Sequence, residues 1–264
     1  MPDFTAIQFT IENSVAWITL NRPEQRNAVN ADMREELISI FTDARTNAAI
    51  RALVLTGSGK GFCTGADLSG PRGQGPTGPG AGRELMKGSS QRLMRALWDL
   101  EKPIVAAVNG VAAGLGSHLA FASDFVIAAA DARFIEVFVR RGIAVDAAGA
   151  FLLPRLIGLQ KAKELVFFGD DLKAEEAQRI GLVSKVVPAD QLQATAREWA
   201  ERLAKGPTYA IGMSKRLLNR SLESSLETAL EEEAMGQMLV TQSEDTREGM
   251  TAFMERRAPA FKGK

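Results

Sequence analysis

The chain has 264 residues, 45% of them hydrophobic and 24% charged, which suits a globular protein with one large domain or a domain and an appendage. Its 32 basic and 32 acidic residues give a formal net charge of zero, which argues against a nucleic-acid or anionic-membrane partner, because either favours a basic surplus. A single cysteine excludes an intrachain disulfide and, with a single histidine, leaves too few ligands for a zinc site, so we expect no metal and a reducing, cytoplasmic setting.

The apolar segments of the chain are short. None approaches the roughly 18 residues of a membrane span. None at the N-terminus follows a basic stretch, so we expect no secretory signal. Four apolar segments instead have the length and composition of buried strands, and two of these end on glycine. They are Ser14–Leu20, Arg51–Gly57, Pro103–Gly110 and Asp124–Ala130.

Helical patterns alternate with these strands. Residues 30–47 begin at Asn30, a favourable N-cap, and carry apolar residues at helical spacing. Residues 83–102 show the same spacing and stop just before Pro103, which cannot continue a helix. The alternation of strands and helices predicts an α/β architecture.

A segment rich in glycine and proline, Ser69–Gly82, interrupts this alternation. Its composition cannot bury a core and predicts a mobile loop. Two interpretations remain open and are compatible: a disordered surface loop, or a flexible wall over a substrate pocket.

Beyond about Gly206 the pattern is helical only. Three segments between residues 207 and 259 carry apolar residues at helical spacing, and their methionines read as core or subunit-contact residues. A helical tail that cannot bury its own apolar face predicts an oligomer interface. We therefore divide the chain into a core, residues 1–205, and a C-terminal oligomerisation region, residues 206–264.

Two glycine-rich turns follow strands and lead into helix-like starts. They are Gly57–Leu68 and Val108–Phe121. Backbone N–H groups at a strand–helix junction lack intrahelical partners and bind negative charge. Two such turns that face one point would form an oxyanion hole. A nucleotide phosphate loop is the alternative, although neither turn matches the usual phosphate-binding patterns.

The sequence resembles the crotonase (enoyl-CoA hydratase/isomerase) superfamily over nearly its whole length. Several ordered motifs at the family's spacing carry this resemblance. They are Ile18–Asn30, Gly57–Leu68, Lys102–Ala128, Gly149–Gly158, Lys161–Pro188 and the tail from Glu244.

The resemblance implies an α/β fold, with a crotonase-type ββα superhelix (spiral) core and a helical C-terminal trimerisation region. It also implies an acyl-CoA thioester substrate, no cofactor beyond the coenzyme A of that substrate, and a homotrimer or a hexamer made of two trimers. By motif match, the amides of Ala66 and Leu115 hold the thioester oxygen.

The family's coenzyme A segments match two stretches of this chain. The resemblance implies that Ala28, Gly65, Asp67 and Leu68 lie near the nucleotide, mostly through their backbone. Arg26 is a candidate phosphate contact, and a surface arginine with no ligand is the alternative.

The chain departs from the hydratases of this family at both catalytic glutamates. The first position carries His118 and the second falls on Phe138 in the substrate pocket. Asp146 stands where isomerases of the family often carry an acid, and its surroundings especially resemble the ring-1,2-epoxyphenylacetyl-CoA isomerase branch. A single carboxylate suffices to move a double bond, and an apolar pocket raises its pKa toward the working range. Asp146 as a mere helix N-cap is the alternative.

His118 and Glu136 complete the candidate catalytic residues. His118 is expected to face the pocket, where it orients Asp146, binds substrate, acts as the base, or is only a core residue. Glu136 enters the site if the alignment shifts, which would restore hydratase activity. The leading hypothesis is an isomerase that converts a β,γ to an α,β double bond. The alternatives are a 2-enoyl-CoA hydratase, an aroyl-CoA dehalogenase-like enzyme with Asp146 as nucleophile, and a non-catalytic CoA-binding protein.

Overall fold

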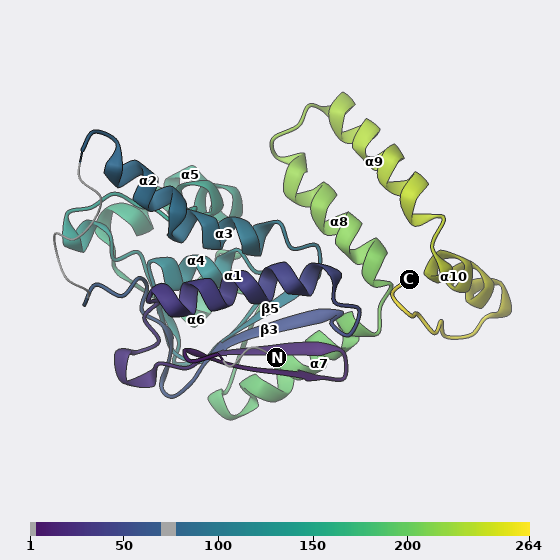
Figure 1. Cartoon of the computed structure of the whole chain (residues 1–264), viewed down its shortest axis with the longest axis horizontal. Helices are drawn as coiled ribbons and strands as arrows, with labels where there is room; N and C mark the ends of the chain where they lie inside the picture. The colour runs from purple at the N-terminus through teal and green to yellow at the C-terminus, as the bar shows by residue number, and fades with distance from the viewer. Residues whose placement is uncertain (1–3, 70–77) are drawn as a thin grey trace.

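The computed structural model describes residues 4–69 and 78–264, and its strands form two sheets (Figure 1). The strands are β1 (Ile7–Glu12), β2 (Val15–Leu20), β3 (Ala52–Gly57), β4 (Gly61–Cys63), β5 (Ile104–Val108), β6 (Val111–Ala113), β7 (Phe125–Ala129), β8 (Arg133–Ile135), β9 (Asp171–Lys173) and β10 (Lys185–Val187). The larger sheet has the order β1-β2-β3-β5-β7-β10, and the smaller has the order β4-β6-β8-β9. Neighbouring strands are parallel except in the pairs β1–β2 and β8–β9.

From β3 to β8, consecutive strands alternate between the two sheets, and one or more helices follow each pair. β3, β5 and β7 lie side by side in the larger sheet, while β4, β6 and β8 lie side by side in the smaller one. This is the repeated ββα unit that the sequence resemblance implies. The helices are α1 (Ala31–Thr46), α2 (Ala81–Gly88), α3 (Ser90–Trp98), α4 (Leu115–Phe121), α5 (Gly149–Phe168), α6 (Ala174–Arg179), α7 (Leu192–Ala204), α8 (Thr208–Ser221), α9 (Leu226–Val240) and α10 (Glu244–Glu255).

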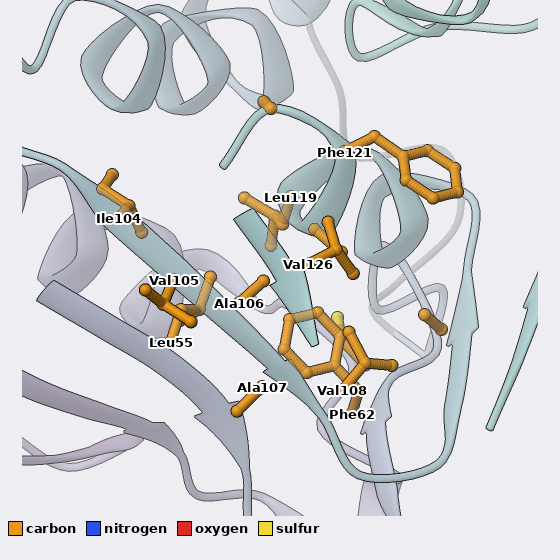
Figure 2. Packing of buried hydrophobic residues seen from close by; sticks show 14 of the residues in the cluster. Leu55, Phe62, Ile104, Val105, Ala106, Ala107, Val108, Leu119, Phe121 and Val126 are labelled. Carbon is orange, nitrogen blue, oxygen red and sulfur yellow. The ribbon is translucent and has the colours of Figure 1, made fainter. Parts of the chain in front are cut away.

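The core lies between the larger sheet and the helices that cover it. Every residue of β3 and β5 is buried, as expected for parallel strands covered on both faces. Figure 2 shows Leu55 of β3 and Val105 of β5 in the same cluster as Phe62 of β4, Leu119 of α4 and Val126 of β7. The chain's apolar runs therefore fix the position of α4, whose first turn belongs to the candidate site.

Glycine is required where each repeat passes from one sheet to the other. A Cβ atom on Gly57, at the end of β3, would collide with the carbonyl oxygen of Gly61. A Cβ atom on Gly110, after β5, would collide with the carbonyl oxygen of Lys60. These contacts explain why both predicted strands end on glycine, since only hydrogen fits at the crossing.

The four predicted strands agree with β2, β3, β5 and β7, β1 was not predicted, and two helical patterns differ from the structure. Residues 83–102 do not form one helix, because the chain breaks at Ser89 between α2 and α3, and α3 ends at Trp98. The first glycine turn does not enter a helix, because Ala66 forms an isolated bridge with Val29 instead. Most of Ser69–Gly82 lies outside the described residues, and its last two residues begin α2.

The helices α8, α9 and α10 extend away from the two sheets (Figure 1). Their apolar residues are unevenly buried, and Met213 packs inside. The large exposed apolar residues of these helices and of the C-cap of α8 include Leu218, Leu222, Leu226, Leu230, Met235, Met238, Leu239, Met250, Phe253 and Met254. The division at residue 205 stays a prediction. In the described part of the chain, no helix is long and apolar enough to cross a bilayer.

Candidate active site

The two glycine turns lie against each other. Gly65 follows β4 with a φ of +97°, a left-handed conformation that favours glycine. A Cβ atom there would lie 2.9 Å from the carbonyl oxygen of Ala113 and 3.7 Å from the amide nitrogen of Leu115. The turn that carries Ala66 therefore sits beside the first residue of α4.

Two further glycines allow α4 to lie close to the turn that carries Ala66. Gly114 has φ +52° and ψ −121°, a region that side chains avoid, and its amide donates to the carbonyl oxygen of Ile135 at 2.9 Å. A Cβ atom on Gly116 would collide with the carbonyl oxygen of Cys63. The first turn of α4 thus packs directly on the backbone of β4, with no side chain between them.

The amides of Ala66 and Leu115 are both available to an acceptor. Val29 forms hydrogen bonds with the residues on either side of Ala66. Its amide donates to the carbonyl oxygen of Gly65 at 2.8 Å, and its carbonyl oxygen accepts from the amide of Asp67 at 2.9 Å. Leu115 is the first residue of α4, where an amide has no intrahelical acceptor. Within residues 4–69 and 78–264, neither amide donates to another backbone group. Two such donors can hold a carbonyl oxygen or an oxyanion.

A buried asparagine that the sequence analysis missed anchors the turn before Val29. Asn27 is fully buried with a φ of 56°, and its side-chain oxygen accepts from the amide of Arg22 at 2.9 Å. Its side-chain nitrogen donates to the carbonyl oxygens of Ser58 and Gly61 at 2.9 and 2.8 Å. Asparagine is among the few residues that tolerate this left-handed backbone, which is the only sequence signal that could have identified it.

Asn27→Ala is expected to lower the free energy of unfolding by about 2–4 kcal/mol, because it leaves buried backbone groups without partners. Asn13→Ala is the matched control, since Asn13 has a similar φ of 51° but is exposed. Urea denaturation of both variants measures the difference. Equal losses for the two variants would show that backbone conformation, and not the buried hydrogen bonds, sets the cost.

The predicted coenzyme A segments meet around an ion pair. Arg22 donates to the carbonyl oxygen of Ala28 at 2.6 Å and to the carboxylate of Asp67 at 2.8 Å. Hydrogen bonds from Ser69, and then Arg22, lower the pKa of the Asp67 carboxyl to about 2. Asp67 is therefore ionised and held by the protein itself. The sequence analysis named Asp67 and missed Arg22.

Two other residues of these segments, Leu68 and Arg26, are exposed to solvent. The side chain of Leu68 is 59% exposed. Arg26 is exposed too, and its carbonyl oxygen accepts from the amide and the hydroxyl of Thr64, both at 3.2 Å. These bonds tie the two predicted segments together through the backbone. The contact of Arg26 with a phosphate stays a prediction.

The structure brings the candidate catalytic side chains together. His118 is fully buried on α4, and its Nε2 lies 3.0 Å from a carboxylate oxygen of Glu136, which is also buried. Phe138 stacks on the imidazole, with ring centroids 5.5 Å apart and planes inclined by 13°. Both His118 and Glu136 act electrostatically on Asp146. Glu136 thus reaches the site without any shift of the alignment.

Asp146 lies in a strained turn before α5. Ala147 and Ala148, the next two residues, have φ values of 45° and 65°, which alanine rarely adopts. The N-cap of α5 is Ala148 and no side chain caps this helix, so the interpretation of Asp146 as an N-cap is wrong. In the described part of the chain, no hydrogen bond holds the Asp146 carboxylate, and only burial and the electrostatic influence of His118 and Glu136 act on it.

Burial sets the acidity of Asp146. The half-buried position raises the pKa of its carboxyl. Electrostatic interaction with His118 lowers this pKa, and electrostatic interaction with Glu136 raises it. An unbound carboxylate with a raised pKa is suited to accept and return a proton. Cys63, by contrast, is buried in the core, and desolvation raises the pKa of its thiol to about 12.

Comparisons with known proteins agree with this geometry. The family profile "Enoyl-CoA hydratase/isomerase" matches residues 10–264. The 1,2-epoxyphenylacetyl-CoA isomerase of Escherichia coli (strain K12) is 40% identical over 255 residues, which cover 96% of this chain and 97% of that protein. The short-chain-enoyl-CoA hydratase of Clostridium acetobutylicum is 39% identical over 250 residues, 93% of each chain.

A solved structure extends the agreement to the fold. The crystal structure of an enoyl-CoA hydratase/isomerase from Cupriavidus metallidurans CH34 matches with a TM-score of 0.93 and 35% sequence identity, covering 100% of this chain and 98% of that one. Sequence and fold therefore agree over the full length. The chain belongs to the enoyl-CoA hydratase/isomerase family of enzymes.

Proposed function

We propose that this enzyme moves the double bond of an enoyl-CoA from the β,γ to the α,β position. Asp146 removes a proton from the α-carbon, and the electron pair of that C–H bond forms an enolate. The amides of Ala66 and Leu115 stabilise the enolate oxygen. Asp146 then returns the proton to the γ-carbon, the double bond forms between the α- and β-carbons, and the thioester carbonyl is restored. No cofactor beyond the coenzyme A of the substrate takes part.

The observation that carries this proposal is the free carboxylate of Asp146. Glu136 is bound to His118, whereas Asp146 is held by no hydrogen bond in the described residues, and burial raises its pKa. One free carboxylate is sufficient for a proton shuttle along an allylic system. The relative from Escherichia coli that is named an isomerase supports the same reaction class.

A 2-enoyl-CoA hydratase is the second candidate, and a specific contact favours it. Hydration requires a group that activates water and a group that supplies a proton. Glu136 and His118 are hydrogen-bonded at 3.0 Å beside Asp146, so the site holds more than one titratable group. Relatives named as hydratases are also closely similar to this chain.

Incubation of a 3-enoyl-CoA with the enzyme in deuterated water separates these reactions. We expect the conjugated 2-enoyl-CoA as the product, with exchange of the α-hydrogen followed by proton nuclear magnetic resonance. Crotonyl-CoA is the parallel substrate, and its rapid conversion to a 3-hydroxyacyl-CoA without any isomerisation would favour the hydratase. Halide release from a halobenzoyl-CoA would indicate the dehalogenase. Tight binding of coenzyme A with no turnover of any thioester would indicate a non-catalytic protein.

We also propose that the chain assembles as a homotrimer or as a hexamer of two trimers. The support is the run of exposed apolar side chains along α8, α9 and α10, of which Phe253 is 81% exposed. Such a surface is larger than single exposed residues and is costly to leave in water. Sedimentation equilibrium tests the proposal, because a particle with the mass of one 28.5 kDa chain would contradict it.

A further inference from the structure

His118 supports the turn that carries Asp146. The imidazole occupies the space in which a side chain of Gly149 would lie, because a Cβ atom there would collide with its Cε1 and Nε2 atoms. Gly149 is the first residue of α5, and its amide donates to the carbonyl oxygen of Asp146 at 2.8 Å. The ring of His118 and the backbone of Asp146 are thus linked through a single residue.

Three contacts fix the ring of His118 itself. Glu136 binds its Nε2 at 3.0 Å, Phe138 stacks on one face, and Gly149 closes the edge that holds Cε1 and Nε2. The side chains of His118 and Glu136 are both more than nine-tenths buried. A buried charged group keeps its place when it is paired, so Glu136 determines where the ring can sit.

The turn at Ala147 and Ala148 is not stabilised by its own residues. Ala147 and Ala148 both have left-handed backbone conformations, and this persists in alanine only where the surroundings impose it. No side-chain cap stabilises the start of α5. The surroundings that impose the conformation include the ring of His118, packed against Gly149.

We propose that His118 and Glu136 are positioning residues, which hold the Asp146 carboxylate in place for proton transfer by bracing the turn at Gly149. Glu136 acts through His118, and His118 acts through Gly149. This inference rests on the proposed role of Asp146 as the base. Neither residue needs to touch the substrate.

The same pair adjusts the acidity of Asp146. His118 from α4 lowers the pKa of the Asp146 carboxyl, and Glu136, after β8, raises it by a smaller amount. The first turn of α5 contributes no acidic residue. Removal of the His118 side chain is therefore expected to raise the pKa of Asp146. A base acts in its ionised form, so activity at acidic pH is lost earlier.

The test uses His118→Gln, Glu136→Gln and the double variant, with isomerisation of a 3-enoyl-CoA as the assay. Glutamine retains a hydrogen-bonding group at each position, which favours folding. We expect kcat to fall about 10- to 100-fold with KM changed less than about twofold, since a small misplacement of a catalytic group costs this much. The acid limb of the pH profile of His118→Gln should move to higher pH. The double variant should be no slower than the slower single variant, because the two residues act as a unit.

Two further variants distinguish failure of the positioning proposal from failure of the proposed function. Glu175→Gln, an exposed carboxylate on α6, is the matched control and should behave as the native enzyme. An unchanged kcat in any folded single variant would overturn the positioning role of the residue that it replaces. Inactivation as complete as that of Asp146→Asn would also overturn it, because the pair would then act in the chemistry itself. If Asp146→Asn keeps full activity, the proposed function fails instead. Thermal unfolding of each variant shows whether it is folded, and either single variant alone is sufficient for the test.

Discussion

Asp146→Asn is expected to lower kcat for isomerisation of a 3-enoyl-CoA by about 10²- to 10⁴-fold, the usual contribution of one general acid–base group. The amide has nearly the shape of the carboxyl group but cannot accept the α-proton. Binding of coenzyme A should persist, because Asp146 is not part of the segments around Arg22 and Asp67. Steady-state kinetics with one 3-enoyl-CoA measures both effects.

Asp131→Asn is the matched control for this substitution. Asp131 is an exposed aspartate between β7 and β8, so its amide variant should keep the native rate. A native rate in Asp146→Asn would show that another group is the base, and Glu136 would be the next candidate. A large rise in KM with an unchanged kcat would instead assign Asp146 to substrate binding.

Gly116→Ala is expected to lower kcat by about 10²- to 10³-fold, which is the usual effect of losing one oxyanion donor. The added methyl group collides with the carbonyl oxygen of Cys63, so the first turn of α4 must move and take the Leu115 amide with it. Because Gly116 is buried and closely packed, the free energy of unfolding should also fall by about 1–3 kcal/mol. Enzyme kinetics and urea denaturation measure the two effects.

Gly88→Ala is the control for the oxyanion prediction. Gly88 ends α2 and a Cβ atom there meets no neighbour within 4 Å, so the variant should be neutral or slightly more stable. Loss of stability without loss of kcat in Gly116→Ala would contradict the role of the Leu115 amide. Both readouts are needed, because a partly unfolded enzyme also loses activity.

The sequence predicted four of the longer strands, α1 and the C-terminal helices, and it missed the short strands as well as β1, α5 and α7. The four predicted strands appear within one or two residues of their expected ends, because each has a clear apolar pattern. The strands β4, β6, β8 and β9 have three residues each, which is too short for an alternating pattern to be recognised. Residues 83–102 form two helices because Gly88, Ser89 and Ser90 are weak helix formers in the middle of the pattern.

The candidate site, too, could be predicted only in part from the sequence. Motifs along the chain identified Ala66, Leu115 and Asp146 as candidates, since each belongs to a short segment with a recognisable pattern. The contact between His118 and Glu136 could not be derived, because it depends on the pairing of β6 with β8 and on where α4 begins. The left-handed backbone at Ala147 was also unforeseeable, because alanine gives no sequence signal for it.

The most direct measurement is a crystal structure of Asp146→Asn with a bound 3-enoyl-CoA. The account predicts that the thioester oxygen accepts hydrogen bonds from the amides of both Ala66 and Leu115, each at about 2.7–3.1 Å. It also predicts the residue 146 side chain next to the α-carbon. A thioester oxygen bonded to neither amide, or an α-carbon out of reach of residue 146, would contradict it.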